Sequence, residues 1–125
     1  MDGSAARRII CITAVVGLWG CSSPFETGCK AYAASSFSVL VHDSLSGASI
    51  EAGSQLLWTG PSTGSVVFPT DAALNGVPIA GPFEQSGTFH VTVRHDGYRD
   101  WSRDVRVTAD RCHVKGVSVT ALMQR

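Results

Sequence analysis

The chain has 125 residues, and its ten Lys and Arg residues balance ten Asp and Glu, which gives a formal net charge of zero at neutral pH. This length is enough for one small domain. No cluster of Lys and Arg stands out, and the Arg residues of the C-terminal third alternate with Asp, so nucleic acid is not expected as a partner, because phosphates are neutralised by clustered Lys and Arg. The same distribution of charge argues against electrostatic docking to an anionic membrane surface.

The first twenty residues have the organisation of a secretory signal. Arg7 and Arg8 precede an apolar run over residues 9–17, which is too short to cross a bilayer as a helix. The run ends in Leu18-Trp19-Gly20-Cys21, which resembles the lipobox of bacterial lipoproteins, although Trp19 stands where a small residue is usual. The resemblance implies that residues 1–20 are a signal peptide that is removed.

Cys21 would then be the first residue of the mature protein and would carry acyl chains such as palmitate. The membrane is therefore the expected partner, reached through the lipid on Cys21. Ser22 follows the cysteine instead of an aspartate. In lipoproteins of double-membraned bacteria, that choice implies transfer to the outer membrane.

The other cysteines divide by their position. Cys11 lies in the signal, which leaves Cys29 and Cys112 as a pair in an exported chain. Because disulfides persist outside the cytosol, we expect a Cys29–Cys112 bond. Such a bond would close a long loop and, in the chain-entropy description, contribute up to about 4–5 kcal/mol. Two alternatives stay open: unpaired thiols, and cleavage after Ala31-x-Ala33, which would remove Cys29.

Residues 21–36 show little periodicity and are interpreted as a tether. The domain is expected over residues 37–123. Its first strand alternates apolar and polar residues from Phe37 to His42, and further strands are expected at residues 54–59 and 65–68. The prolines within residues 71–82 allow only a short edge strand near residues 79–84.

The strongest alternation covers residues 89–94. Asp96 and Gly97 then predict a type I′ hairpin turn. A partner strand follows at residues 101–108, and a last strand at residues 112–122 is expected to contain a bulge or bend near Gly116. No helical spacing occurs after the signal. The sequence therefore predicts an all-β protein, a small antiparallel β-sandwich of six to seven strands.

The predicted core consists of the apolar residues that share a face along these strands. They are Phe37, Val39, Val41, Leu56, Trp58, Val67, Phe89, Val91, Val93, Tyr98, Trp101, Val105, Val107, Val117 and Val119.

Four segments together resemble the carboxypeptidase regulatory-like domain. Residues 39–50 are similar to its opening strand and Asp-x-x-Thr-Gly turn, with Ser46 in place of the threonine and Ser49 in place of a proline. Residues 84–93 are similar to its Gly-Thr-Tyr strand, with Phe89 for the tyrosine. Gly97-Tyr98 resembles its hairpin, and residues 112–114 a variant found in short lipoproteins. The resemblance implies a transthyretin-like or immunoglobulin-like β-sandwich in a secreted context, with no shared catalytic residues.

No constellation predicts catalysis or a metal site. The four histidines at positions 42, 90, 95 and 113 are scattered, and neither a paired metal-ligand motif nor a nucleophile elbow occurs. We therefore expect no catalytic residue, no metal and no cofactor. The candidate binding surface consists of Trp58, which could stack on a sugar, and of Arg94 and Arg106 in a segment where Arg and Asp alternate.

The expected function is that of a non-enzymatic, lipid-anchored envelope protein acting as a binding or structural accessory. Its further partners would be envelope proteins or glycans. The alternative is a carbohydrate- or peptidoglycan-binding module that uses exposed aromatic side chains. Exposure of Trp58 distinguishes the two hypotheses, because a buried ring cannot serve as a platform.

Overall fold

The computed structural model describes residues 29–125, so the predicted signal peptide, Cys21 and the first part of the tether lie outside the described residues. The chain divides into two compact units, Met1–Ala31 and Tyr32–Arg125. The strands that the structure describes all belong to the second unit.

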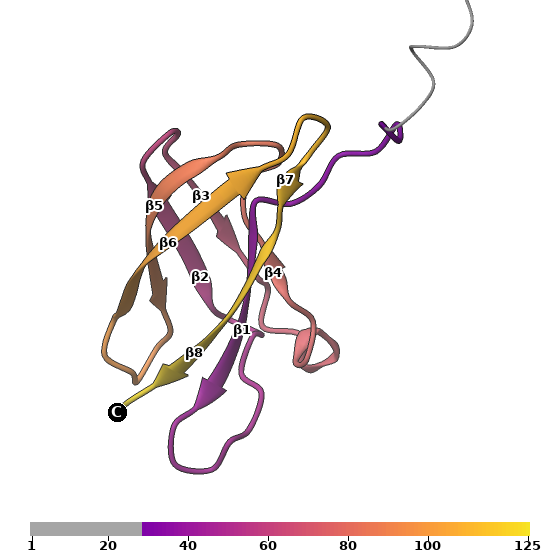
Figure 1. Ribbon diagram of the computed structural model, residues 1–125. Helices are drawn as coiled ribbons and strands as arrows, with labels where there is room; N and C mark the ends of the chain where they lie inside the picture. Colours follow the sequence, from indigo (N-terminus) through magenta and orange to yellow (C-terminus); the bar gives the residue numbers. More distant parts are fainter. Residues whose placement is uncertain (1–28) are drawn as a thin grey trace, which may run out of the picture. The chain divides into compact units, whose positions relative to one another are not determined.

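Two sheets form this unit (Figure 1). The smaller sheet has the strand order β4-β1-β8, and the larger has the order β3-β2-β5-β6-β7. The strands are β1 (Phe37–Asp43), β2 (Gln55–Thr59), β3 (Gly64–Val67), β4 (Ile79–Ala80), β5 (Gly87–Arg94), β6 (Trp101–Ala109), β7 (Val114–Lys115) and β8 (Val117–Met123). A 3-10 turn, η1 (Ala72–Leu74), precedes β4. The predicted all-β sandwich is confirmed.

The predicted strand count and direction need correction. Eight strands are described instead of six or seven, because the predicted last strand over residues 112–122 is divided into β7 and β8. The sandwich is also not wholly antiparallel, since β1 and β8 run parallel from Phe37 and Val117 to Asp43 and Met123. Parallel pairing follows from the route of the chain, which passes from the larger sheet to the smaller one before β8 pairs with β1.

Gly116 is the point of that passage. The predicted bend is present, but it separates β7, which pairs with β6, from β8, which pairs with β1. A Cβ atom at Gly116 would lie 2.8 Å from the Ser35 carbonyl oxygen. Glycine is therefore required there by close backbone approach and not by its own conformational freedom.

The β5–β6 connection also differs from the prediction. Tyr98 N donates to His95 O at 3.0 Å, and Gly97 has φ 82°. Asp96 does not share the positive φ. A type I′ turn requires positive φ at both central residues of the four. A positive φ at the third residue alone, here Gly97, is typical of a type II turn. The type I′ prediction is wrong.

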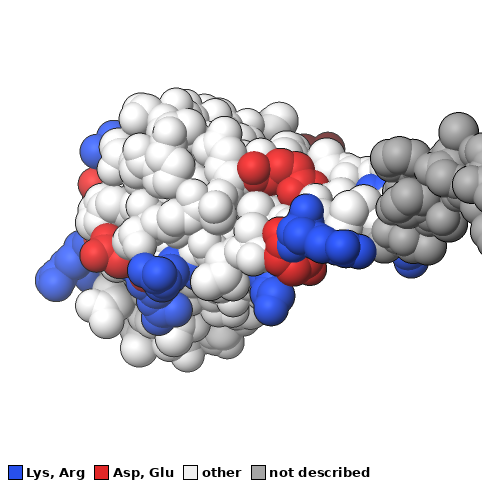
Figure 2. All heavy atoms as spheres, turned by 45° about the horizontal axis from the view of Figure 1, so that its top comes forward, with Lys and Arg blue, Asp and Glu red and all other residues white. Residues whose placement is uncertain are grey.

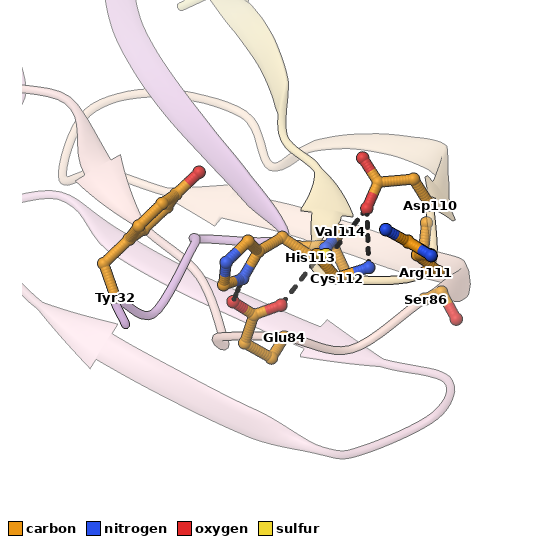
Figure 3. A pocket seen from close by; sticks show the side chains of 9 residues that line it. Tyr32, Glu84, Ser86, Asp110, Arg111, Cys112, His113 and Val114 are labelled. Carbon is orange, nitrogen blue, oxygen red and sulfur yellow. Dashed lines mark hydrogen bonds and ion pairs between the residues drawn. The ribbon is translucent and has the colours of Figure 1, made fainter. Parts of the chain in front are cut away.

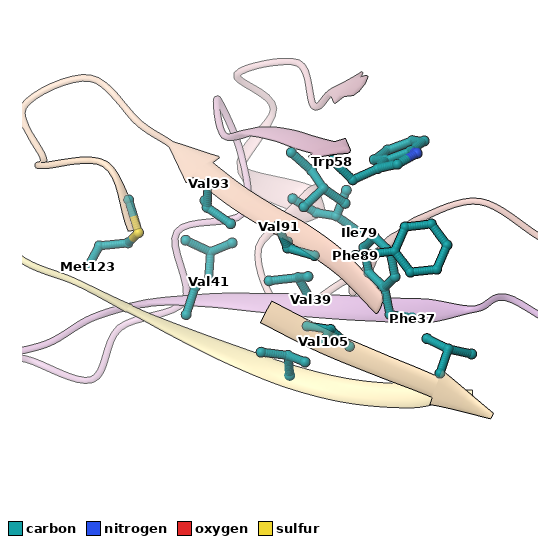
Figure 4. Close-up of a cluster of buried hydrophobic side chains, with 14 of the residues drawn as sticks. Phe37, Val39, Val41, Trp58, Ile79, Phe89, Val91, Val93, Val105 and Met123 are labelled. Carbon is teal, nitrogen blue, oxygen red and sulfur yellow. The ribbon is translucent and has the colours of Figure 1, made fainter. Parts of the chain in front are cut away.

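Alternating residues of both sheets meet in the core (Figure 4). Eleven of the predicted residues are buried: Phe37, Val39, Val41, Leu56, Trp58, Phe89, Val91, Val93, Val105, Val107 and Val119. Tyr98, Trp101 and Val117 are half-buried and pack against it. The core further contains Ile79, Val114, Ala121 and Met123, which the alternation did not identify.

Val67 is the one predicted core residue that lies on the surface, with 64% of its area exposed. It stands opposite Gln55, whereas its neighbour Val66 stands opposite the buried Leu56 and packs against the core. Because side chains alternate with a period of two, an error of one residue in this short Val-Val strand reverses the face.

The β1–β2 connection carries a buried carboxylate that binds β1 and the loop before β4. Glu51 is fully buried. Its Oε2 accepts from Val41 N at 2.7 Å, and its Oε1 accepts from Gly76 N at 2.6 Å. Strand β4 pairs β1 only at Ser38 and Val39. The Glu51 carboxylate therefore takes the place of a strand partner where β4 has not yet begun.

A pair of Val→Ala variants tests the assignment of faces. Val91→Ala removes a fully buried side chain and is expected to lower the free energy of unfolding by about 2–3 kcal/mol, from lost burial plus a cavity. Val67→Ala is the matched control and should change it by less than about 0.5 kcal/mol. Denaturant titration measures both, and equal losses would contradict the assignment.

Candidate functional site

A shallow hollow of about 450 Å³ lies where β7 begins and where the chain approaches β1 (Figure 3). It is lined by Tyr32, Glu84, Asp110, Arg111 and His113, among others. We take this hollow as the candidate site, because it brings together acidic, basic and imidazole side chains from three segments of the chain.

Glu84 is the centre of the site. Its Oε2 accepts from Ala34 N at 2.8 Å and lies 2.6 Å from His113 Nδ1, while Oε1 accepts from Val114 N at 3.1 Å. Its own N–H donates to Ala34 O at 2.9 Å. The Ala34 amide, and next to it His113, lower the pKa of the Glu84 carboxyl. The carboxylate thus joins the segment before β1 to the start of β7.

The Glu84 backbone is in the left-handed region, with φ 54°. It is the one non-glycine residue with positive φ among residues 29–125. That conformation is costly for a residue with a Cβ and persists only where surrounding contacts impose it. The bonds to Ala34, His113 and Val114 are those contacts.

His113 is held from two further sides. The Tyr32 ring stacks on it, with centroids 4.3 Å apart and an angle of 23° between the planes. Asp110 Oδ1 accepts from Cys112 N at 2.8 Å and from His113 N at 2.9 Å. The His113 amide first, then the Cys112 amide, lower the pKa of Asp110. The turn that leads into β7 is therefore fixed by a side chain of its own.

This chemistry favours a structural role. Glu84 accepts from backbone amides of two other segments, and Asp110 Oδ1 accepts from two amides of its own turn, so both side chains are engaged in holding the backbone. Within residues 29–125, no three His, Cys, Asp or Glu residues are grouped so that they could hold a metal ion.

A second carboxylate cluster lies where β1 ends. Asp43 is buried, and its Oδ2 accepts from Tyr98 Oη at 2.6 Å. Its Oδ1 accepts from Leu45 N and Ser46 N, each at 2.9 Å. The Tyr98 hydroxyl and these amides hold the pKa of the Asp43 carboxyl well below its usual range. Arg125 lies 3.4 Å from Asp43 Oδ2 and over the Tyr98 ring.

Trp58 is not a binding platform. Only 9% of the Trp58 surface is accessible to solvent, and its ring contacts Phe37 edge-on with ring centroids 6.0 Å apart. Its indole Nε1 donates to Ser62 Oγ at 3.3 Å. The prediction that Trp58 belongs to a binding surface is wrong, and the glycan-binding hypothesis loses the side chain on which it depended.

Arg94 and Arg106 are both exposed but are not brought together. Arg94 Nε donates to Asp100 Oδ2 at 3.0 Å. Arg106 stands opposite Thr88, six positions along β5 from Arg94, and six strand residues span about 20 Å. Figure 2 shows basic and acidic side chains interspersed on the face it presents. No joint basic patch follows from this pair.

The four histidines occupy separate places. His90 Nδ1 lies 2.8 Å from Asp104 on the outer face of the larger sheet, and His95 Nε2 lies 3.1 Å from the Ala52 carbonyl oxygen. His42 is half-buried on β1. Only His113 joins the candidate site.

The cysteine prediction is confirmed for one pair. Cys29 and Cys112 are both disulfide-bonded, as predicted. Cys11, Cys21 and the lipobox lie outside the described residues. Residues 29–125 contain no helix with the length and hydropathy needed to span a membrane.

Comparison with known proteins adds no relative: no protein-family model, no curated protein and no solved structure matches this chain. Its function must therefore be inferred from its own residues.

Sequence reasoning missed Glu84, because a glutamate among Phe83, Gln85 and Ser86 is typical of any surface loop. It also missed the contact of Tyr32 with His113, since Tyr32 was placed in the tether. The signal that remained visible was Asp110, three residues before His113, in a spacing typical of a side chain that caps its own turn.

Acidification tests the Glu84 link. Because its folded pKa is lowered, the stabilisation by Glu84 is present above the ordinary carboxyl pKa and is lost as the pH falls through the folded pKa. Glu84→Gln should therefore lower the melting temperature at neutral pH and reduce its further loss in acid.

The matched control is Asp104→Asn, which breaks the exposed His90–Asp104 pair. Exposed pairs contribute little, so this variant should melt close to the wild type at every pH. Thermal melts across the acid range measure both variants. A Glu84→Gln curve parallel to that of the wild type would refute the role given to the carboxylate.

Proposed function

We propose that this protein is a non-enzymatic, lipid-anchored component of the bacterial envelope, a structural or binding accessory held at the outer membrane by acyl chains on Cys21. The observation that carries the proposal is the lipobox-like ending at residues 18–21. The disulfide-bonded state of Cys29 and Cys112 supports it, since disulfides persist in oxidising compartments.

The fold supports a role as a rigid module. The carboxylates of Glu51, Glu84 and Asp43 each accept from backbone amides, and each ties together segments that are distant in the sequence or fixes a turn. Side chains used in this way stabilise a domain and are poorly placed to react with a substrate. We therefore assign the protein to the non-enzymes.

The resemblance to the carboxypeptidase regulatory-like domain is part of the same proposal. Such domains act as stalks, spacers or interaction modules. Two sheets of three and five strands are compatible with that family, but architecture alone does not establish membership.

Anchoring would proceed in stages that the chain can provide. Acyl chains at Cys21 enter the membrane, and more than one chain is needed for a stable hold. The predicted tether, residues 22–36, would space the sandwich from the bilayer, and the Cys29–Cys112 bond would fix where the tether leaves the fold.

Intact-mass spectrometry of the membrane fraction tests the anchor. The wild-type protein should begin at Cys21 and carry additional acyl mass, whereas Cys21→Ser should lack both. Cys11→Ser is the matched control, because it makes the same change inside the predicted signal and should yield the same mature mass as the wild type. An unmodified wild-type N-terminus would overturn the proposal.

A further inference from the structure

Strands β1 and β8 are the first and the last strand of the described chain, and they lie side by side. They run parallel over seven paired positions, from Phe37 opposite Val117 to Asp43 opposite Met123. Both strands therefore begin at the end of the second unit where the chain enters β1, and both finish at the opposite end (Figure 1). The hydrogen bonds of a parallel pair are evenly spaced, so together they oppose sliding of one strand along the other.

The two strands are joined where they begin. Cys29 of the predicted tether is disulfide-bonded to Cys112, which lies shortly before β7 and β8. The Glu84 carboxylate accepts from Ala34 N at 2.8 Å and from Val114 N at 3.1 Å, and so binds the segment before β1 to β7. A pull on the tether therefore reaches β1 through the chain itself and β8 through the disulfide.

The far ends of the two strands are also joined. Ser44 N, directly after β1, donates to the carbonyl oxygen of Met123, the last residue of β8, at 2.9 Å. Arg125 Nη2 lies 3.4 Å from Asp43 Oδ2. Neither contact involves the larger sheet. The parallel pair is thus closed at both of its ends.

This arrangement gives tension between the tether and the C-terminal residues a short covalent route. The route passes from Cys29 through the disulfide to Cys112 and then along residues 113–125, most of which already lie extended in β7 and β8. An extended strand is close to its full length and lengthens little under load. Residues 30–111, which include β2, β3, β5 and β6 of the larger sheet, stay outside this route.

We propose that the parallel β1–β8 pair carries mechanical tension between the membrane anchor and the far end of the sandwich, and that the Cys29–Cys112 bond keeps the larger sheet free of it. The biological source of this tension, the lipid on Cys21, rests on the proposed function, whereas the mechanical property does not. Such an accessory holds an envelope partner at a fixed distance from the membrane under a pull, without unfolding.

The geometry of the pair determines what happens when the disulfide is absent. Tension then enters at the start of β1 and leaves at the end of β8, which loads all the hydrogen bonds between the strands in shear. A pull on the starts of both strands opens the same bonds one after another. Bonds that share a load fail at a higher force than bonds that fail in turn, so the shear geometry is the more resistant one.

Single-molecule force spectroscopy of the full-length chain tests the route. A Cys11→Ser/Cys21→Ser background leaves only the Cys29–Cys112 pair and removes lipidation. Held at its two ends, the oxidised chain should show no unfolding step of the sandwich. A dithiol reductant added to the folded chain should then produce one step of about 280 Å, the extended length of residues 29–112.

The matched comparison changes only the direction of the pull. In the reduced chain, a bio-orthogonal handle in place of the exposed Arg111 replaces the C-terminal handle, so that β1 is peeled from the start of β8. The bonds then fail in turn, and the step should occur at a force at least about threefold lower than in the pull between the chain ends.

Three results would overturn the proposal. They are a full unfolding step in the oxidised chain, extension of the freshly reduced chain at negligible force, and equal unfolding forces in the two pulling geometries. Failure of the anchoring proposal is a separate result, because it is measured by the intact mass at Cys21 and leaves the force measurements unchanged.

Discussion

The bond from the buried Glu51 carboxylate to the Val41 amide is the interaction on which the sandwich depends most. Strand β1 is the centre of the smaller sheet, but β4 covers only its first residues. Without a carboxylate oxygen, the Val41 N–H would be buried and unpaired, which is costly. The second oxygen binds Gly76 N, so one side chain also positions the segment that leads into β4.

The same use of carboxylates recurs at two other places. Asp43 receives the Tyr98 hydroxyl and two amides where β1 ends, and Glu84 receives Ala34 and Val114 near its start. Each binds a loop to a strand by charge-assisted bonds. In a small domain with short strands, such bonds fix the loops. The acidic side chains that make them are then used to hold the fold. This pattern connects the fold with the proposed accessory role.

Much of the fold could be predicted because alternation is a local signal. The alternation of apolar and polar residues alone located the strands around Val39, Val91 and Val105. The break at Gly116 was visible because the apolar residues change from even to odd positions there. The parallel β1–β8 pair was not predictable, since it depends on where the chain goes after Gly116. The candidate site was missed because Glu84 and His113 become neighbours only through strand topology, and Trp58 was ambiguous because Leu57 beside it is also apolar.

Amide hydrogen exchange at Val41 and Gly76, the two amides that donate to the Glu51 carboxylate, measures the central interaction most directly. Gly76 and Gly97 are both exposed turn glycines with positive φ. Gly76 N donates to Glu51, whereas Gly97 N has no hydrogen-bond partner within residues 29–125. We predict that the Gly76 amide exchanges at least a hundredfold more slowly than that of Gly97, together with strong protection of Val41. Equal exchange at the two glycines, with rapid exchange at Val41, would contradict the role given to Glu51.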